Sequence, residues 1–219
     1  MDIFEAKKIA LEVDKEVDDE LMGKTEKVIS GTAQEAFFKA FGDKNGTSYG
    51  VIPDSRGYWS LPVSKFENIT SMQSMFSCIN RLFSLDLDNL DTSKVTDMRH
   101  MFTCCLSLSE LNLNGWDTGC VTSMDGMFTC CESLTSLDLS GFDTSQVTSM
   151  SRMFQDCESL TTLDLSGWNT SNVADMGSMF NSCSTLKNIT MKGCSQETVD
   201  KIKAQLAKDY IYGVNIITE

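Results

Sequence analysis

The chain has 219 residues, of which 41% are hydrophobic and 22% are charged, as in an ordinary folded protein. Its formal net charge is -13, and residues 61–194 alone hold 15 acidic and 7 basic side chains. Such a negative field repels phosphate groups and anionic lipid headgroups, which argues against nucleic acid and membrane surfaces as partners. The sequence also contains no run approaching the ~20 apolar residues that a membrane-spanning helix needs.

Residues 1–60 are predicted to form a helical N-terminal region. Apolar side chains recur at steps of three and four over residues 3–22, which predicts an amphipathic helix. A second short helix is predicted over residues 32–41. Residues 43–60 are rich in Gly, Asn, Asp and Ser, so we expect a loop and a domain boundary there. The first helix either caps the repeats that follow or serves self-association or attachment.

One motif repeats at a fixed spacing through the middle of the chain. A Met-Phe pair marks it at Met75-Phe76, Met101-Phe102, Met127-Phe128, Met153-Phe154 and Met179-Phe180. A Leu-x-Leu pair recurs with the same period at Leu85/Leu87, Leu111/Leu113, Leu137/Leu139 and Leu163/Leu165. A constant period of about 26 residues, within the range of roughly 20–50, indicates a stacked repeat architecture. We therefore predict an α+β solenoid of about five repeats over residues 61–194.

The residue pattern within one repeat predicts its shape. Leu137 and Leu139 alternate with polar residues, which indicates a short strand with an apolar inner face, and stacked copies would form a parallel sheet. Farther along the repeat, apolar residues step by three, which predicts a short helix or 3₁₀ turn with one buried side. These residues are Val147, Met150, Met153 and Phe154.

Residues 195–219 are predicted to close the end of the stack. Residues 195–208 read as a capping helix with Ser195 as its N-cap. Its predicted inner face consists of Val199, Ile202 and Leu206. The apolar alternation over residues 210–218 then predicts a closing strand.

The repeat, whose consensus is LxxLDLSxxDTSxVTxMxxMFxxC, resembles that of the BspA-like leucine-rich-repeat surface proteins. The resemblance covers roughly residues 63–194, and three successive repeats fill nearly every consensus position. It implies a right-handed leucine-rich-repeat solenoid, a non-catalytic binding role and a cell-surface or virion-associated location. The chain departs from the family pattern at its start, which carries no apolar segment typical of a secretory signal, so a cytoplasmic location stays open.

An acidic column is predicted on the outer side of the strands. Asp86, Asp138 and Asp164 occupy equivalent positions, with Asn112 in the same column and Glu110 in a neighbouring one. The column is either a set of solvated positions kept by repeat duplication, or a strip that binds a basic protein patch or a polar glycan. A calcium ladder is a third interpretation, but the glycine-rich nonapeptide of calcium-binding β-rolls is absent.

Aromatic residues form a second column at Trp116, Phe142 and Trp168. An exposed aromatic row would suit sugar stacking or a protein contact. Alternatively, these side chains pack over the edge of the strands.

Seven of the nine cysteines follow the repeat, and Cys120 and Cys194 lie outside its columns. Cys105, Cys131, Cys157 and Cys183 should form a ladder along the core, and Ile79 takes the equivalent place in the first repeat. Ile cannot bind a metal, and zinc would need four thiolates converging on one point, so the ladder favours packing over ligation. Stacked rungs approach disulfide reach, but the odd count and the regularity favour free thiols in a reducing or anaerobic setting.

We expect no catalysis, no cofactor and no metal. The only histidine, His100, lies in a variable column, so we expect it to be exposed, and the chain has no phosphate-binding loop or nucleophile elbow. The predicted function is non-enzymatic binding or adhesion through the strand face, with a protein or a surface glycan as partner. The alternative is a structural or host-recognition part of a larger assembly, such as a phage or virion tail, anchored by residues 1–60 and self-associating through residues 3–22.

Overall fold

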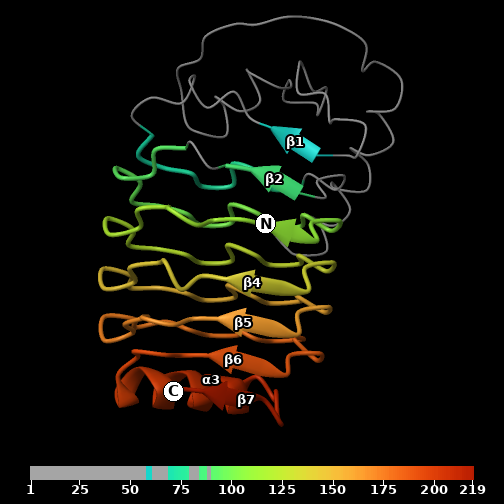
Figure 1. Cartoon of the computed structure of the whole chain (residues 1–219), viewed down its shortest axis with the longest axis vertical. Helices are drawn as coiled ribbons and strands as arrows, with labels where there is room; N and C mark the ends of the chain where they lie inside the picture. Colours follow the sequence, from blue (N-terminus) through green and yellow to red (C-terminus); the bar gives the residue numbers. More distant parts are fainter. Residues whose placement is uncertain (1–57, 61–68, 79–83, 88–89) are drawn as a thin grey trace, which may run out of the picture.

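The computed structural model describes residues 58–60, 69–78, 84–87 and 90–219, in which short strands stack one above another (Figure 1). The helices predicted over residues 3–22 and 32–41 lie outside these ranges. The described elements are β1 (Tyr58–Ser60), β2 (Ser84–Asp86), β3 (Glu110–Leu111), β4 (Ser136–Asp138), β5 (Thr162–Asp164), β6 (Asn188–Thr190), α3 (Gln196–Lys208) and β7 (Asn215–Ile217).

The strands pair in parallel, and between the strands of the repeats the register of the pairing equals the sequence period. Ser136 lies opposite Thr162, and Thr162 lies opposite Asn188, so each residue pairs with its own equivalent in the next repeat. One sheet has the order β1-β2-β3 and a second has the order β4-β5-β6-β7. Each repeat therefore supplies one rung of the stack.

The stack begins earlier than the sequence predicted. The segment 43–60 was expected to be a loop, yet its last three residues form β1, in which Tyr58 pairs with Ser84 of β2. The pairing offset is again one sequence period. Trp59 and Leu61 continue the Leu-x-Leu spacing in the sequence, so the signal was present but was hidden by the turn-forming residues before it.

On the other side of each rung, consecutive turns replace the predicted helix or 3₁₀ turn. The Met153 amide donates to the Met150 carbonyl at 3.3 Å, whereas the next amide, of Phe154, donates to Met179 of the following rung at 2.9 Å. Arg152 and Asp156 have φ of 57° and 58°, in the left-handed region. A left-handed residue interrupts a right-handed helix, so the chain turns repeatedly and bonds to its neighbouring rung instead.

The core between these two sides is apolar and continuous along the stack. Leu137 of β4 is 3% exposed, and the equivalent Leu163 of β5 is 2% exposed. Opposite them, five phenylalanine rings stack with neighbouring centroids 5.3 to 5.8 Å apart. They are Phe76, Phe102, Phe128, Phe154 and Phe180.

Helix α3 covers the C-terminal end of this core. Ser195 is its N-cap, and the Ser195 hydroxyl accepts a hydrogen bond from the Thr198 amide at 3.2 Å. The buried side contains Val199, Ile202 and Leu206. The closing strand is shorter than the predicted range 210–218, because Tyr210 and Gly213 have φ of 61° and 76°, which breaks the extended chain before β7.

Candidate binding surface

The strand face is the outer side of β3 to β6, formed by the side chains that alternate with the buried leucines. Glu110, Asn112 and Asp138 are exposed there, and Asp164 is half-buried. Asp86 belongs to β2, but its side chain lies outside the described part of the structure. Asp138 and Asp164 are direct partners in the parallel register, so two carboxylates sit side by side on neighbouring strands.

The acidic column also shapes the turn that follows each strand. Oδ1 of Asp138 accepts the Ser140 amide at 2.9 Å, and Oδ1 of Asp164 accepts the Ser166 amide at 2.9 Å. Asn112 accepts the Asn114 amide in the same way at 3.0 Å. An asparagine oxygen performs this turn function as well as a carboxylate does. The turn therefore explains why the column holds Asp or Asn, but it does not explain why Asp138 and Asp164 carry a negative charge where Asn would serve.

The aromatic column lies in the core and does not form an exposed row. Trp116 is 5% exposed and Trp168 is 1% exposed. The Trp168 indole Nε1 donates to the Leu139 carbonyl at 3.1 Å, and the Trp116 ring stacks on Phe142 with centroids 6.5 Å apart. Both tryptophans, which the sequence offered as binding residues, thus pack over the strand edge, where a partner cannot reach their rings.

The predicted thiol ladder lines the core beside the phenylalanine stack. Cys105, Cys131, Cys157 and Cys183 are all buried, and each Sγ donates to the carbonyl of the residue 29 positions earlier at 3.0 to 3.2 Å. Burial raises the pKa of the Cys131 and Cys157 thiols well above the ordinary value, and it raises the pKa of Cys183 to about 12. These three thiols are therefore uncharged in the folded chain at neutral pH.

A second cysteine column runs along the outside of the ladder. Cys104 and Cys130 are buried in contact with each other, and Cys78 is half-buried beside them. A hydrogen bond from the Cys104 thiol lowers the pKa of Cys78 to about 7, whereas hydrogen bonds with Cys130 and Cys78 raise the pKa of Cys104. None of the nine cysteines, all of which lie in the described ranges, forms a disulfide bond in this structure.

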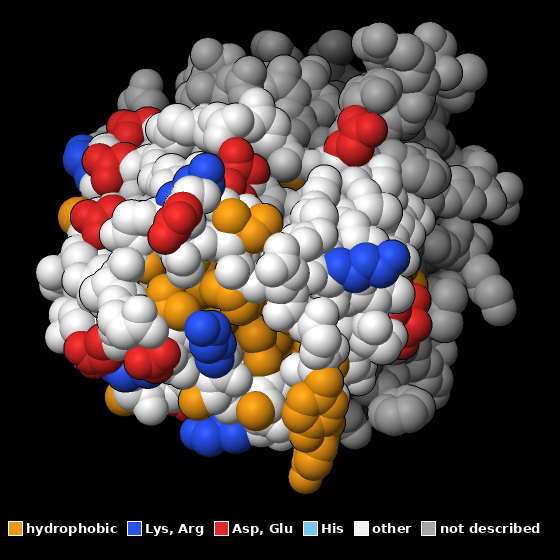
Figure 2. Space-filling model, turned by 60° about the horizontal axis from the view of Figure 1, so that its bottom comes forward, with side chains coloured by type: hydrophobic (Ala, Val, Ile, Leu, Met, Phe, Trp, Pro, Cys, Tyr) orange, Lys and Arg blue, Asp and Glu red, His pale blue; other side chains and the backbone are white. Residues whose placement is uncertain are grey.

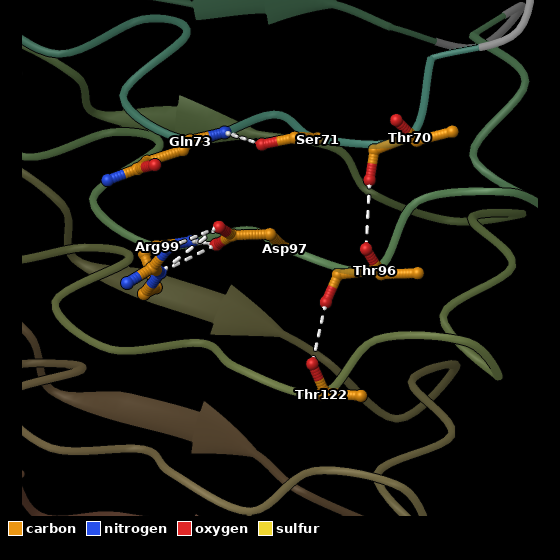
Figure 3. A network of polar contacts seen from close by, with 7 residues as sticks. All are labelled: Thr70, Ser71, Gln73, Thr96, Asp97, Arg99 and Thr122. Carbon is orange, nitrogen blue, oxygen red and sulfur yellow. Dashed lines mark hydrogen bonds and ion pairs between the residues drawn. The ribbon is translucent and has the colours of Figure 1, made fainter.

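The turn face, formed by residues 70–78 and their equivalents in later rungs, carries polar groups that the sequence analysis did not single out. Figure 3 shows the Arg99 guanidinium folded onto the Asp97 carboxylate, with Nη2 and Oδ2 2.6 Å apart. Beside this pair, the Thr96 and Thr122 hydroxyls each donate to the threonine carbonyl one rung earlier at 3.1 Å. The signal was a periodic one, since positions 71, 97, 123, 149 and 175 all hold Ser or Asp.

His100 lies on the turn face and is half-buried, although its variable column suggested exposure. A Cβ built on Gly126 of the next rung would overlap Nδ1 of the His100 ring. Burial lowers the pKa of His100, while the nearby Asp125 carboxylate opposes that shift.

Among the described residues, no three His, Cys, Asp or Glu side chains come together as metal ligands. Within the same ranges, no helix has the length and apolar character needed to cross a membrane.

The profile of one protein family matches residues 64–206, and that family is described as "Mycoplasma protein of unknown function, DUF285". The match covers more than half of the chain and includes every described repeat from residue 69 to α3. No curated protein matches the chain.

Proposed function

We propose that this chain, which belongs to the family of Mycoplasma proteins of unknown function called DUF285, is a non-enzymatic binding module. In this proposal the repeats form a leucine-rich-repeat-like solenoid of the BspA-like kind. Its strand face recognises a partner protein, at a cell surface or within a larger assembly.

The observation that carries the proposal is the pairing of Asp138 with Asp164. Like charges directly opposite each other on neighbouring strands destabilise a sheet. The turn needs only an Asx oxygen at this place, as Asn112 demonstrates in the previous rung. In both aspartates the bond to the turn amide uses Oδ1, which leaves Oδ2 for a ligand. A lysine or arginine side chain of a partner would relieve the repulsion, so we propose a cationic protein segment as the ligand.

The test uses a fluorescent oligolysine peptide and a double variant, Asp138→Asn with Asp164→Asn. The substitution removes two charges and keeps the Asx hydrogen bonds, so the turns should stay intact. We expect peptide binding to weaken by roughly ten- to thirtyfold in fluorescence anisotropy, since each exposed charge pair contributes up to about 1 kcal/mol. Binding to the native chain should also weaken as salt is raised, because salt screens exposed charges.

The matched control is Asp143→Asn. Asp143 is exposed at another corner of the rung, where its Oδ1 accepts the Ser145 amide at 2.9 Å, and Asn169 makes the same bond in the next rung. This variant loses one charge without touching the strand face. If the loss of binding free energy per removed charge were the same in the control and in the double variant, net charge, and not the strand face, would govern binding.

A surface glycan is the second ligand class proposed for the same strip, and a glycan array with the native chain and the double variant distinguishes the two. Glycan binding without oligolysine binding would replace the cationic protein segment as the ligand. The assembly role anchored by residues 1–60 stays a prediction, because those residues lie almost entirely outside the described ranges.

A further inference from the structure

The outer edge of β7 carries main-chain groups that face away from the sheet. The Asn215 amide donates to the Lys187 carbonyl at 2.7 Å, and the Ile217 carbonyl accepts the Met191 amide at 2.7 Å. Successive residues of a strand direct their main-chain groups to opposite edges, and Ile216 stands between these two residues in the register. The Ile216 amide and carbonyl therefore point outward, beyond the last strand of the β4-β5-β6-β7 sheet.

Apolar side chains come to the surface beside this edge. Tyr210 is 78% exposed and Tyr212 is 72% exposed, and they are the large hydrophobic residues that the described part of the chain leaves in solvent. Ile211, Val214 and Ile216 are only partly covered by the core. Figure 2, with this end of the molecule turned forward, shows hydrophobic side chains at its surface, with Lys, Arg, Asp and Glu side chains around them. We call Tyr210, Tyr212 and β7 the terminal edge.

The end of the molecule that carries the terminal edge is close to neutral, in contrast to the chain as a whole. Residues 187–219 carry five lysines and four acidic residues, a net charge of +1, whereas the chain as a whole carries -13. Two copies that approached through their acidic repeats would repel each other, and two copies that approached through this end would not.

We propose that the terminal edge binds a second copy of this chain, with the two β7 strands pairing antiparallel about a two-fold axis. In an antiparallel pair, two facing residues can exchange both of their N–H···O=C bonds. Ile216 placed opposite its own copy would satisfy the outward amide and the outward carbonyl of both chains together. A two-fold interface uses the same patch on both subunits, so the tyrosines of each copy cover the apolar surface of the other.

The experiment is sedimentation equilibrium of the full chain with three variants. The native chain should show twice its monomer mass of 24.3 kDa, as should Ile216→Val, which keeps the main-chain amide. Ile216→Pro removes the outward amide, which β6 does not use, and should return the mass to that of one chain. Tyr212→Asp alters an exposed side chain and should also give the monomer. This variant tests the proposal even if the proline variant does not fold.

The control for the added charge is Gln146→Asp, on an exposed loop position away from this end, and it should stay dimeric. Hydrogen exchange supplies a second readout, because the Ile216 amide should be protected in the dimer and unprotected in Tyr212→Asp. The proposal is overturned if the native protein has the mass of one chain, and also if its mass exceeds that of two chains. A dimer that persists in Tyr212→Asp, or that requires residues 3–22, overturns it equally, because association would then use another surface.

Discussion

The strand side and the turn side of the stack connect their rungs differently. On the strand side, pairing stops between β3 and β4, and the described strands fall into two sheets. On the turn side, parallel bridges run without a break through Ser71, Asp97, Ser123, Ser149 and Asp175. Between the rungs of β3 and β4, whose strands do not pair, the Phe102 amide of the turn side still donates to the Met127 carbonyl at 2.8 Å. The turn side thus holds the rungs in register, and the strand side can vary its outward side chains at little structural cost.

The largest expected effect is on the phenylalanine stack of the turn side. Phe128→Ala removes the middle ring, which is fully buried between Phe102 and Phe154. We expect the free energy of unfolding to fall by about 3–5 kcal/mol, as for other buried aromatic truncations. Urea unfolding followed by circular dichroism measures this. Ser136→Ala on the strand face should change the free energy of unfolding by less than about 0.5 kcal/mol. Comparable losses in both variants would contradict the difference between the turn side and the strand side.

The thiol ladder should make the turn side sensitive to alkaline pH. Burial raises the pKa of Cys131, Cys157 and Cys183 in the folded chain above the ordinary value of 9.0. A raised folded pKa means that stability is fully present below pH 9 and is lost as pH rises toward the folded value. At pH 10 each of these three thiols should lower the free energy of unfolding by about 1.4 kcal/mol relative to pH 7.

Urea unfolding at pH 7 and pH 10 measures this loss. The matched variant is Cys157→Ala, which lowers stability at both pH values but removes one thiol from the pH-dependent part. A pH dependence that is unchanged in this variant would show that the ladder does not cause it.

A smaller effect is expected where His100 lies over Gly126. Ala at position 126 would bring its Cβ within 2.7 Å of the His100 Cε1 atom. Arg152 and Ser178 hold equivalent positions with φ of 57°, so this backbone tolerates a side chain, and the contact with His100 is what requires glycine. Gly126→Ala should lower the free energy of unfolding by about 1–3 kcal/mol.

A double-mutant cycle separates contact from backbone strain. In a His100→Ala background, Gly126→Ala should be at least about 1 kcal/mol less destabilising, because the clash is gone. Additive effects would show that the left-handed backbone conformation, and not the histidine ring, disfavours a side chain at position 126.

The smallest expected effect concerns the surface pair of Asp97 and Arg99. Burial alone would raise the pKa of Asp97, but hydrogen bonds and charge from Arg99 outweigh it, so the pKa is lowered. A lowered folded pKa gives stability that is present above the ordinary carboxyl value and is lost as pH falls. The Arg99 side chain is 43% exposed, so Arg99→Ala should cost less than about 1 kcal/mol. An NMR titration should show the Asp97 pKa rising in this variant, and an unchanged pKa would exclude Arg99 as the cause.

Several local structures were predictable because short-range chemistry decides them. The helix predicted over residues 195–208 corresponds to α3, since an N-cap serine and an apolar face at helical spacing lie within a few residues of each other. The alternation of Leu137 and Leu139 with polar residues placed the leucines inside and Asp138 outside. At the candidate site, this alternation identified Glu110, Asn112 and Asp138 as outward-facing residues.

Other features depended on neighbours that are distant in sequence. The step of three from Met150 to Met153 suits a helix, and only the hydrogen bonds to the next rung show why the chain makes turns instead. Trp116 and Trp168 occupy a column that could face in or out. Their burial is decided by contacts with neighbouring rungs, such as the Trp116 ring on Phe142 and the Trp168 indole on the Leu139 carbonyl.

The sequence by itself determined the repeat period, the apolar residues that face inward and the helix that ends the described stack, because each is encoded in local spacing and residue type. Only the tertiary structure decided that hydrogen-bonded pairing is continuous on the turn side and interrupted between β3 and β4. It also decided that the outward main-chain groups of Ile216 stand at the last edge of the sheet. Hydrogen bonds between rungs join residues that lie about one repeat apart in the chain, and their geometry follows from how the rungs stack and not from any one repeat.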